Sequence, residues 1–123
     1  MKVWLCRHGQ TSWNAQGRLQ GHEDISLDAT GLEQAQRIHA WMNEQDVVFD
    51  VVYCSDLLRT KQTLQPMLEK NDLNVVVYDS RLREQHLGRF QGFTRNELLN
   101  SEDGNLFSQF KKSHDIDAPG GER

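Results

Sequence analysis

Apolar residues form short clusters that alternate with longer amphipathic stretches along the chain. Three clusters, at residues 2–6, 47–54 and 73–78, are rich in Val, Leu and aromatic residues and predict β-strands. Residues 30–44 carry apolar side chains at helical spacing, and a second amphipathic helix follows the second strand. This alternation predicts an α/β fold with a mostly parallel sheet, in a single domain that spans residues 1–123.

The predicted helices carry recognisable local signals. Thr30 and Glu33 have the spacing of a capping box at the start of the first helix. His39 falls on the apolar stripe of that helix and is expected to be a core or edge residue. Pro66 is expected to kink or interrupt the second helix. Two shorter helices are predicted near the end, at residues 94–100 and 104–112.

Composition narrows the class of protein. The formal net charge is −4, which argues against a general nucleic-acid binder, and the apolar runs are too short to cross a membrane. The two cysteines, Cys6 and Cys54, lack metal-type spacing and follow strand-like runs, so buried free thiols are expected. We therefore expect a cytoplasmic protein without nucleic-acid or membrane partners.

A polar cluster follows each predicted strand. The tripeptide RHG at residues 7–9 follows the first strand, SDLLRT with Arg59 the second, and DSRLRE with Glu84 the third. Taken singly, these have ordinary explanations: a turn, an exposed helix residue and a surface ion pair. However, the carboxyl ends of parallel strands lie at one edge of a sheet, so the clusters should gather along one rim. Their order along the chain favours a functional site.

The residue types in these clusters suit phosphoryl transfer. Arg7 and Arg59 can hold a phosphate through paired hydrogen bonds. A neutral His8 beside that phosphate can attack phosphorus in line and form a phosphohistidine. Glu84, kept protonated by the nearby phosphate dianion, can protonate the leaving alkoxide, and Asn14 can donate to the phosphoryl oxygens.

The same stretches resemble the histidine phosphatase superfamily, the phosphoglycerate-mutase-like enzymes. The opening of that family is similar to LCRHGQTSWNAQGRLQGHEDISLDATGLEQA, its second signature to YCSDLLRTKQT, its third to DSRLREQHLGRFQG and a fourth to APGGE. The resemblance runs from Val3 to Glu122. The resemblance is strongest to the fructose-2,6-bisphosphatases of the glycolysis-and-apoptosis-regulator type. Broad sugar-phosphate phosphatases share much of the same pattern.

The resemblance implies a three-layer α/β/α sandwich that needs no metal or organic cofactor. Its expected partner is a small phosphorylated metabolite. The family's roles pass to seven residues of this chain: nucleophile for His8, phosphate binding for Arg7, Arg59 and Asn14, proton donation for Glu84, and a substrate-side loop for Gln20 and Gly21.

The family's second histidine, which lies in a His-Gly pair after the PGGE stretch, has no match in these residues. None of the other histidines, which are His22, His39, His86 and His114, is followed by glycine. In the family this second histidine stabilises the charge of the transferring phosphoryl group. We therefore expect the chain to lack the C-terminal part of the family fold, and to self-associate through the surface left open.

Three functions fit these observations. The leading prediction is a cofactor-independent phosphomonoesterase that works through His8. The alternative is a catalytically impaired phosphate-binding or interaction protein, because the second histidine is absent. A phosphoglycerate mutase ranks third, since the sequence leaves little room for the capping insertion that such enzymes carry after the third motif.

Overall fold

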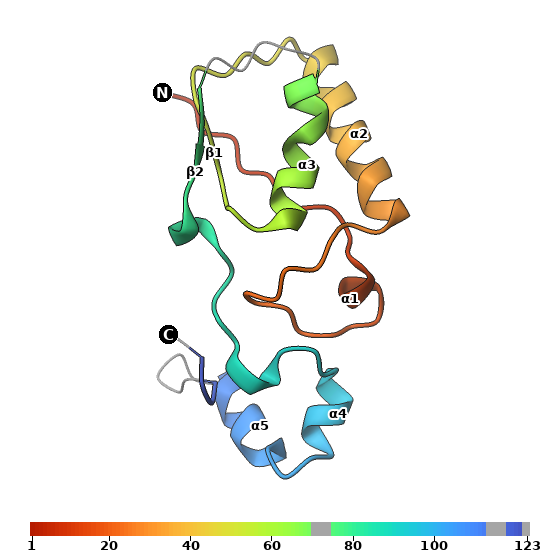
Figure 1. Ribbon diagram of the computed structural model, residues 1–123, viewed down its shortest axis with the longest axis vertical. Helices are drawn as coiled ribbons and strands as arrows, with labels where there is room; N and C mark the ends of the chain where they lie inside the picture. The colour runs from red at the N-terminus through yellow and green to blue at the C-terminus, as the bar shows by residue number, and fades with distance from the viewer. Residues whose placement is uncertain (70–74, 113–117, 122–123) are drawn as a thin grey trace. The chain divides into compact units, whose positions relative to one another are not determined.

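The computed structural model describes residues 1–69, 75–112 and 118–121, and the chain forms two compact units (Figure 1). Unit 1 comprises Met1–Thr11 and Ser26–Leu82. Unit 2 comprises Ser12–Ile25 and Arg83–Arg123. Neither unit is a continuous stretch of sequence, because the chain leaves and re-enters each of them.

Unit 1 contains a small parallel sheet. Strands β1 (Val52–Cys54) and β2 (Val76–Tyr78) pair in parallel, with Tyr53 opposite Val77. Helix α3 (Leu58–Glu69) connects the two strands, and the short helix η1 (Ser80–Leu82) follows β2. The predicted α/β class with a parallel sheet is confirmed. Both strands are shorter than predicted, and residues 73–74 of the third predicted strand lie outside the described residues.

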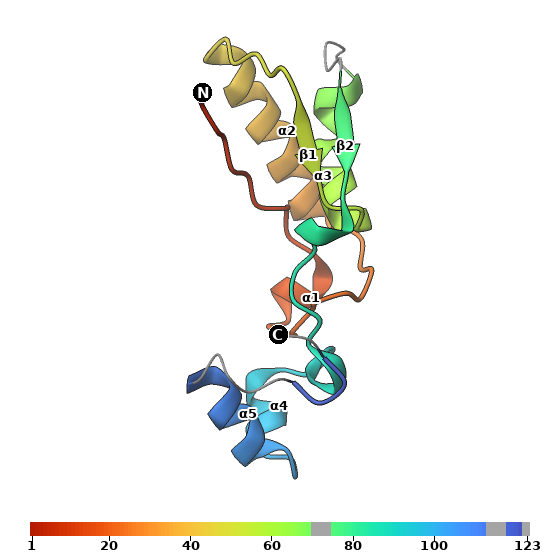
Figure 2. The same cartoon turned by 90° about the vertical axis from the view of Figure 1, so that its left-hand side faces the viewer.

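Helix α2 (Ala29–Glu44) packs beside α3, as both views of the fold show (Figures 1 and 2). Its buried residues recur every three or four positions: Gly31, Ala35, His39 and Met42. His39 is therefore a core residue, as predicted, and its Nε2 lies 3.0 Å from the side-chain nitrogen of Asn43. Pro66 does not interrupt α3, which continues to Glu69, and the alternative of a kink stays a prediction. Because proline has no N–H, the helix passes through Pro66 with one backbone hydrogen bond fewer.

The predicted first strand is also wrong. Residues 2–6 form no strand, and Val3 and Leu5 are 78% and 100% exposed. Among the described residues this segment has no hydrogen-bonded strand partner, and apolar residues alone do not make a strand without one. Instead it runs beside α2 (Figure 2), where the ring of Trp4 meets that of Trp41 edge-on at 5.9 Å between centroids.

The two cysteines differ in exposure because residues 2–6 form no strand. Cys54 ends β1 and is buried, as expected. Cys6, which was expected to be buried at the end of a strand, is exposed because residues 2–6 are not covered by a sheet neighbour. Burial raises the pKa of the Cys54 thiol above its usual value.

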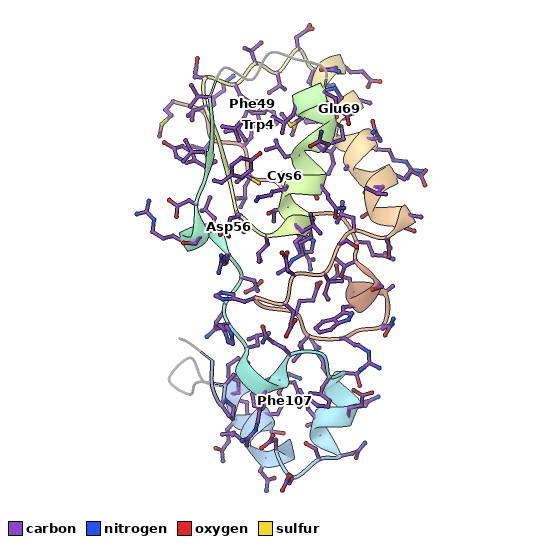
Figure 3. The ribbon with its side chains drawn as sticks, viewed as in Figure 1. Trp4, Cys6, Phe49, Asp56, Glu69 and Phe107 are labelled. Atoms are coloured by element: carbon purple, nitrogen blue, oxygen red, sulfur yellow. The ribbon has the colours of Figure 1, made fainter. Side chains whose placement is uncertain are left out.

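Unit 2 is built around a small aromatic core. It contains α1 (Ser12–Ala15), η2 (Gly88–Phe90), α4 (Arg95–Leu99) and α5 (Gly104–Lys112). The core consists of the buried residues Phe90, Leu98, Phe107 and Ala118. Phe107, labelled in Figure 3, meets the ring of Phe90 edge-on at 5.4 Å between centroids. The aromatic edge contacts add to the burial of apolar area that holds this unit together.

The two short helices of unit 2 are confirmed close to their predicted bounds. Thr94 caps α4, because its hydroxyl accepts from the N–H of Glu97 while the Glu97 carboxylate accepts from the N–H of Thr94. Arg18 adds an ion pair to Glu97 at 3.0 Å, so the loop before Gln20 is fastened to the same helix. Across the described residues, no helix is long and apolar enough to span a membrane.

Candidate active site

His8 is held in one orientation by the residue that follows it. Its ring atom Nδ1 lies 2.6 Å from the carbonyl oxygen of Gly9. A carbonyl oxygen only accepts hydrogen bonds, so Nδ1 carries the proton and donates it. The lone pair of the neutral ring is therefore on Nε2. The half-buried His8 thus presents Nε2 as a nitrogen nucleophile.

The backbone after His8 passes very close to the start of α2. A Cβ at Gly9 would lie 2.6 Å from the carbonyl oxygen of Gly31, and one at Gly31 would lie 2.1 Å from that of Gln10. Both distances are far below any contact between nonbonded heavy atoms. Glycine at both positions is what allows the loop and the helix to touch, and this contact fixes the place of His8 in unit 1.

Asp28 ties the same loop to the helix. It is the N-cap of α2, since its Oδ1 accepts from the N–H of Gly31 at 2.8 Å. Its Oδ2 accepts from the side-chain amide of Gln10 at 2.9 Å, and its own N–H donates to the Gln10 carbonyl. The predicted capping box of Thr30 and Glu33 is wrong, because the helix begins one residue earlier, at Ala29.

Arg59 is a buried cation in the first turn of α3. Its exposed fraction is 2%, whereas an arginine on a helix surface is ordinarily solvated. The Ser55 hydroxyl accepts from the N–H of Leu57 at 3.3 Å just before α3 begins. A guanidinium stays charged at any working pH, so its burial favours a place for an anion. Arg7 lies in the exposed segment that leads to His8.

Thr63 connects the His8 loop to Arg59. Its hydroxyl accepts from the N–H of Gly9 at 2.9 Å and donates to the carbonyl of Arg59 at 2.7 Å. Two predicted site residues of unit 1 are thereby linked through one side chain. Sequence reasoning missed Thr63, because its bond to Gly9 joins residues 54 positions apart and leaves no local signal.

The other four predicted site residues belong to unit 2, and their action on one substrate with the unit 1 residues stays a prediction. Asn14 lies in α1 and is half-buried, and Gln20 is buried. Gly21 has a φ of +103°, and a Cβ there would lie 2.5 Å from Oε1 of Gln91, so glycine is required. Glu84 is exposed, and its Oε1 accepts from the N–H of Gln85 at 2.9 Å.

Two loop histidines of unit 2 meet directly. The rings of His22 and His86 lie edge to face, with centroids 4.7 Å apart. Nδ1 of His86 accepts from the N–H of Gly88 at 3.0 Å, and the N–H of His22 donates to Gln91 at 2.8 Å. His86 is half-buried, and its ring contacts that of His22.

In the segment that follows β2, a basic side chain is paired with a nearby carboxylate. Arg81 contacts the carboxylate of Asp79 at 2.6 Å, and this hydrogen-bonded pair lowers the pKa of Asp79 to about 2. Where the structure describes the chain, three or more His, Cys, Asp or Glu side chains nowhere gather as a metal site would require. The buried charged group of the site is the Arg59 guanidinium, which suits an anion rather than a cation.

Comparison with known proteins assigns the chain to a family. The model of the histidine phosphatase superfamily (branch 1) matches residues 3–123. The chain belongs to this superfamily. It is 38% identical over 122 residues to phosphoglycerate mutase-like protein 4 of Arabidopsis thaliana, covering 98% of the chain and 52% of that relative. It is also 38% identical over 120 residues to phosphoglycerate mutase 1 of Saccharomyces cerevisiae, covering 96% of the chain and 49% of that enzyme.

Solved structures agree with the family assignment. A mycobacterial glucosyl-3-phosphoglycerate phosphatase in complex with VO3 matches with a TM-score of 0.79 and 33% identity, covering 94% of this chain and 56% of that chain. The superfamily thus includes both phosphatases and mutases. The chain spans about half the length of the curated relatives it matches.

Proposed function

We propose that the protein hydrolyses phosphomonoesters of small metabolites through a phosphohistidine at His8. The observation that carries the proposal is the 2.6 Å contact between Nδ1 of His8 and the Gly9 carbonyl. With the proton on Nδ1, the lone pair of the neutral ring is on Nε2, which is the atom that would attack phosphorus. Histidine nucleophiles form such covalent intermediates, which divide one difficult displacement into two easier ones.

In the first step, Nε2 of His8 forms a bond to phosphorus while the bond from phosphorus to the ester oxygen breaks. Glu84 gives its proton to the departing oxygen, which leaves as an alcohol. In the second step, water attacks phosphorus and gives a proton to the Glu84 carboxylate. The N–P bond then breaks, which returns the electron pair to Nε2 and releases inorganic phosphate. Atoms and charges balance without a metal or an organic cofactor.

The arginines stabilise the phosphoryl group during both steps. Arg59 is buried, so its charge acts in a medium that screens it less than water does. Arg7 and Asn14 contribute further donors, and the loop of Gln20 and Gly21 contacts the rest of the substrate. These roles are carried over from the family motifs that the residues match.

The substrate class is a phosphorylated sugar or a related small acid. Fructose-2,6-bisphosphate is the first candidate, on the resemblance of the second and third motifs. A phosphorylated glycerate is the second, because similar proteins include a phosphoglycerate mutase and a phosphatase of glucosyl-3-phosphoglycerate. The similarity to the yeast mutase also supports a mutase, which transfers the phosphoryl group between positions of one product instead of to water.

The test measures phosphate release and covalent phosphate on the same sample of the 123-residue chain. An aryl phosphate, fructose-2,6-bisphosphate and 3-phosphoglycerate are the substrates. We expect phosphate release and an acid-labile, alkali-stable phosphate on the protein, both abolished in His8→Gln. The matched control is His39→Gln, which changes a core histidine bonded to Asn43 and should keep both signals.

Three results separate the alternatives. Labelled phosphate that moves to a second position of 3-phosphoglycerate, without release, would assign a mutase. Binding of inorganic phosphate without turnover by this chain would assign an impaired phosphate-binding protein. Turnover that persists in His8→Gln would remove the histidine mechanism altogether.

A further inference from the structure

The hydroxyl of Thr63 makes two hydrogen bonds of different range. Threonine in a helix commonly donates to the carbonyl four residues earlier, and Thr63 does so to Arg59 at 2.7 Å. The oxygen also accepts from the N–H of Gly9, 54 residues earlier in the chain, at 2.9 Å. One hydroxyl can satisfy both, because it has one proton to donate and two lone pairs.

Three contacts hold the backbone of Gly9 in place. Its N–H is held by Thr63, and its carbonyl accepts from Nδ1 of His8 at 2.6 Å. Its Cα faces the backbone of Gly31 so closely that a Cβ would lie 2.6 Å from that carbonyl. The bond to Thr63 fixes the His8–Gly9 peptide, which lies between the His8 ring and the Gly9 carbonyl. The carbonyl itself belongs to the next peptide, whose N–H donates to Oε1 of Gln34 at 2.8 Å. The place of His8 relative to this carbonyl therefore depends on Thr63, which holds the first of the two peptides.

We propose that Thr63 is a positioning residue, whose hydroxyl sets the ring orientation of His8 through Gly9 and fixes it against Arg59. The inference rests on the proposed function, in which Nε2 of His8 is the nucleophile. Thr63 does not contact the reacting atoms in this account. It determines which ring nitrogen carries the proton and where the other one points.

A positioning role predicts a specific effect on the rate of catalysis. A small misplacement of a reacting atom can cost about a hundredfold in rate. Loss of the Thr63 hydroxyl should therefore lower kcat by about that factor. Phosphate affinity should change little, because the Arg59 guanidinium remains. A residue that only stabilises the fold would show no such division between kcat and KM.

The direct readout is the tautomer of His8, measured from ring nitrogen chemical shifts in chain labelled with ¹⁵N-histidine. The measurement is made well above the usual pKa of histidine, and His8→Gln assigns the signals. Thr63→Ala removes the hydroxyl and leaves room, whereas the extra methyl of Thr63→Val would face the Gly9 nitrogen too closely. Thr63→Ser keeps the hydroxyl and is the rescue variant.

Thr60→Val is the matched control on the same helix. The Thr60 hydroxyl lies 2.8 Å from the carbonyl of Ser55 and 2.6 Å from that of Leu57, so it bonds α3 only locally. We expect a single His8 tautomer, protonated on Nδ1, in the unchanged chain, in Thr63→Ser and in Thr60→Val. Thr63→Ala should give a mixture of the two tautomers.

A wild-type tautomer population in folded Thr63→Ala would overturn the proposal. If that variant does not fold, hydrogen exchange of the Gly9 amide in the unchanged chain decides instead: slow exchange supports the bond to Thr63, and fast exchange refutes it. The ring measurement requires no turnover. If the unchanged chain shows the Nδ1–H tautomer but no phosphatase activity, the proposed function is wrong. The tautomer measurement still tests the effect of Thr63 on His8.

Discussion

Asp28 accepts a hydrogen bond from the side-chain amide of Gln10 at 2.9 Å while it caps helix α2. The cap of the helix and the loop that follows His8 are therefore stabilised by the same carboxylate. A change at Asp28 acts on both, which makes it a sensitive probe of the structure around the candidate nucleophile.

Asp28→Ala should lower the free energy of unfolding by about 1–2 kcal/mol, the usual cost of losing an N-cap. Asp28→Asn should cost less than Asp28→Ala, because its amide oxygen still caps the helix while its NH2 group replaces the oxygen that accepts from Gln10. Urea denaturation of the two variants measures the difference. Equal stabilities for Ala and Asn at this position would show that the cap is not formed.

Gly31→Ala should destabilise the protein, although glycine in a helix is ordinarily less stable than alanine by about 0.5–1 kcal/mol. The reason is the new Cβ, which would lie 2.1 Å from the carbonyl oxygen of Gln10. The comparison is Ala40→Gly, at an exposed position of the same helix, which should cost about 1 kcal/mol. A stabilised Gly31→Ala in thermal or urea unfolding would mean that the His8 loop does not touch α2.

Arg59→Lys should weaken phosphate binding by about tenfold to a hundredfold, since a charged hydrogen bond contributes about 1.5–3 kcal/mol and an ammonium cannot form the paired contacts of a guanidinium. The rise in Tm with added inorganic phosphate measures this loss. Arg37→Lys is the control, because Arg37 is exposed and pairs with Glu33 on α2. An equal phosphate response in both variants would take Arg59 out of the anion site.

Asp79 should contribute to stability in a limited pH range. Its pKa in the folded protein is about 2, below the ordinary value of 3.8, because Arg81 binds the carboxylate. A lowered folded pKa gives stability that is fully present above the unfolded pKa and is lost as pH falls through the folded one. Unfolding free energies between about pH 4 and pH 2 should therefore fall less steeply in Asp79→Asn and in Arg81→Gln. Unaltered slopes in both variants would show that the pair is not formed in solution.

Cys6 should react with a thiol reagent much faster than Cys54. Cys6 lies in the exposed segment 2–6, whereas Cys54 is buried at the end of β1. Desolvation raises the pKa of both thiols, so the difference in labelling rate comes from the access of the reagent. Two-phase labelling in the folded chain, with the fast phase absent from Cys6→Ser, is the expected result. Slow labelling at both positions would place residues 2–6 inside a sheet, as the sequence pattern alone predicts.

Local signals predicted the helices well. The bounds of α5 agree with the predicted helix at residues 104–112, and α4 begins after the capping box of Thr94 and Glu97. The same kind of signal failed at Thr30, because Asp28 offers a cap two residues earlier and α2 starts there. Asp28 also accepts from Gln10, a contact with the preceding loop that the helix sequence alone does not show.

The strands and the site depended on distant residues. Residues 2–6 have the composition of a strand, but a strand also needs a partner, which a hydrophobic pattern does not supply. The family motifs named His8 and Arg59, both of which lie in unit 1, and their roles stay a prediction. Thr63 was not found, because its importance comes from a hydrogen bond across 54 residues rather than from its own neighbours.

The discontinuity of both units has a consequence for the order of events during folding. Ser12–Ile25 belongs with residues from Arg83 onward, so this loop is synthesised long before its partners. The hydrogen bond from Arg18 to the carbonyl of Gly92 closes a separation of 74 residues. Such contacts must overcome a large loop entropy before they stabilise anything, and they form slowly. Unit 2 should therefore be the late step of folding, and during translation residues 12–25 remain without their unit 2 partners until the chain beyond Arg83 has been made.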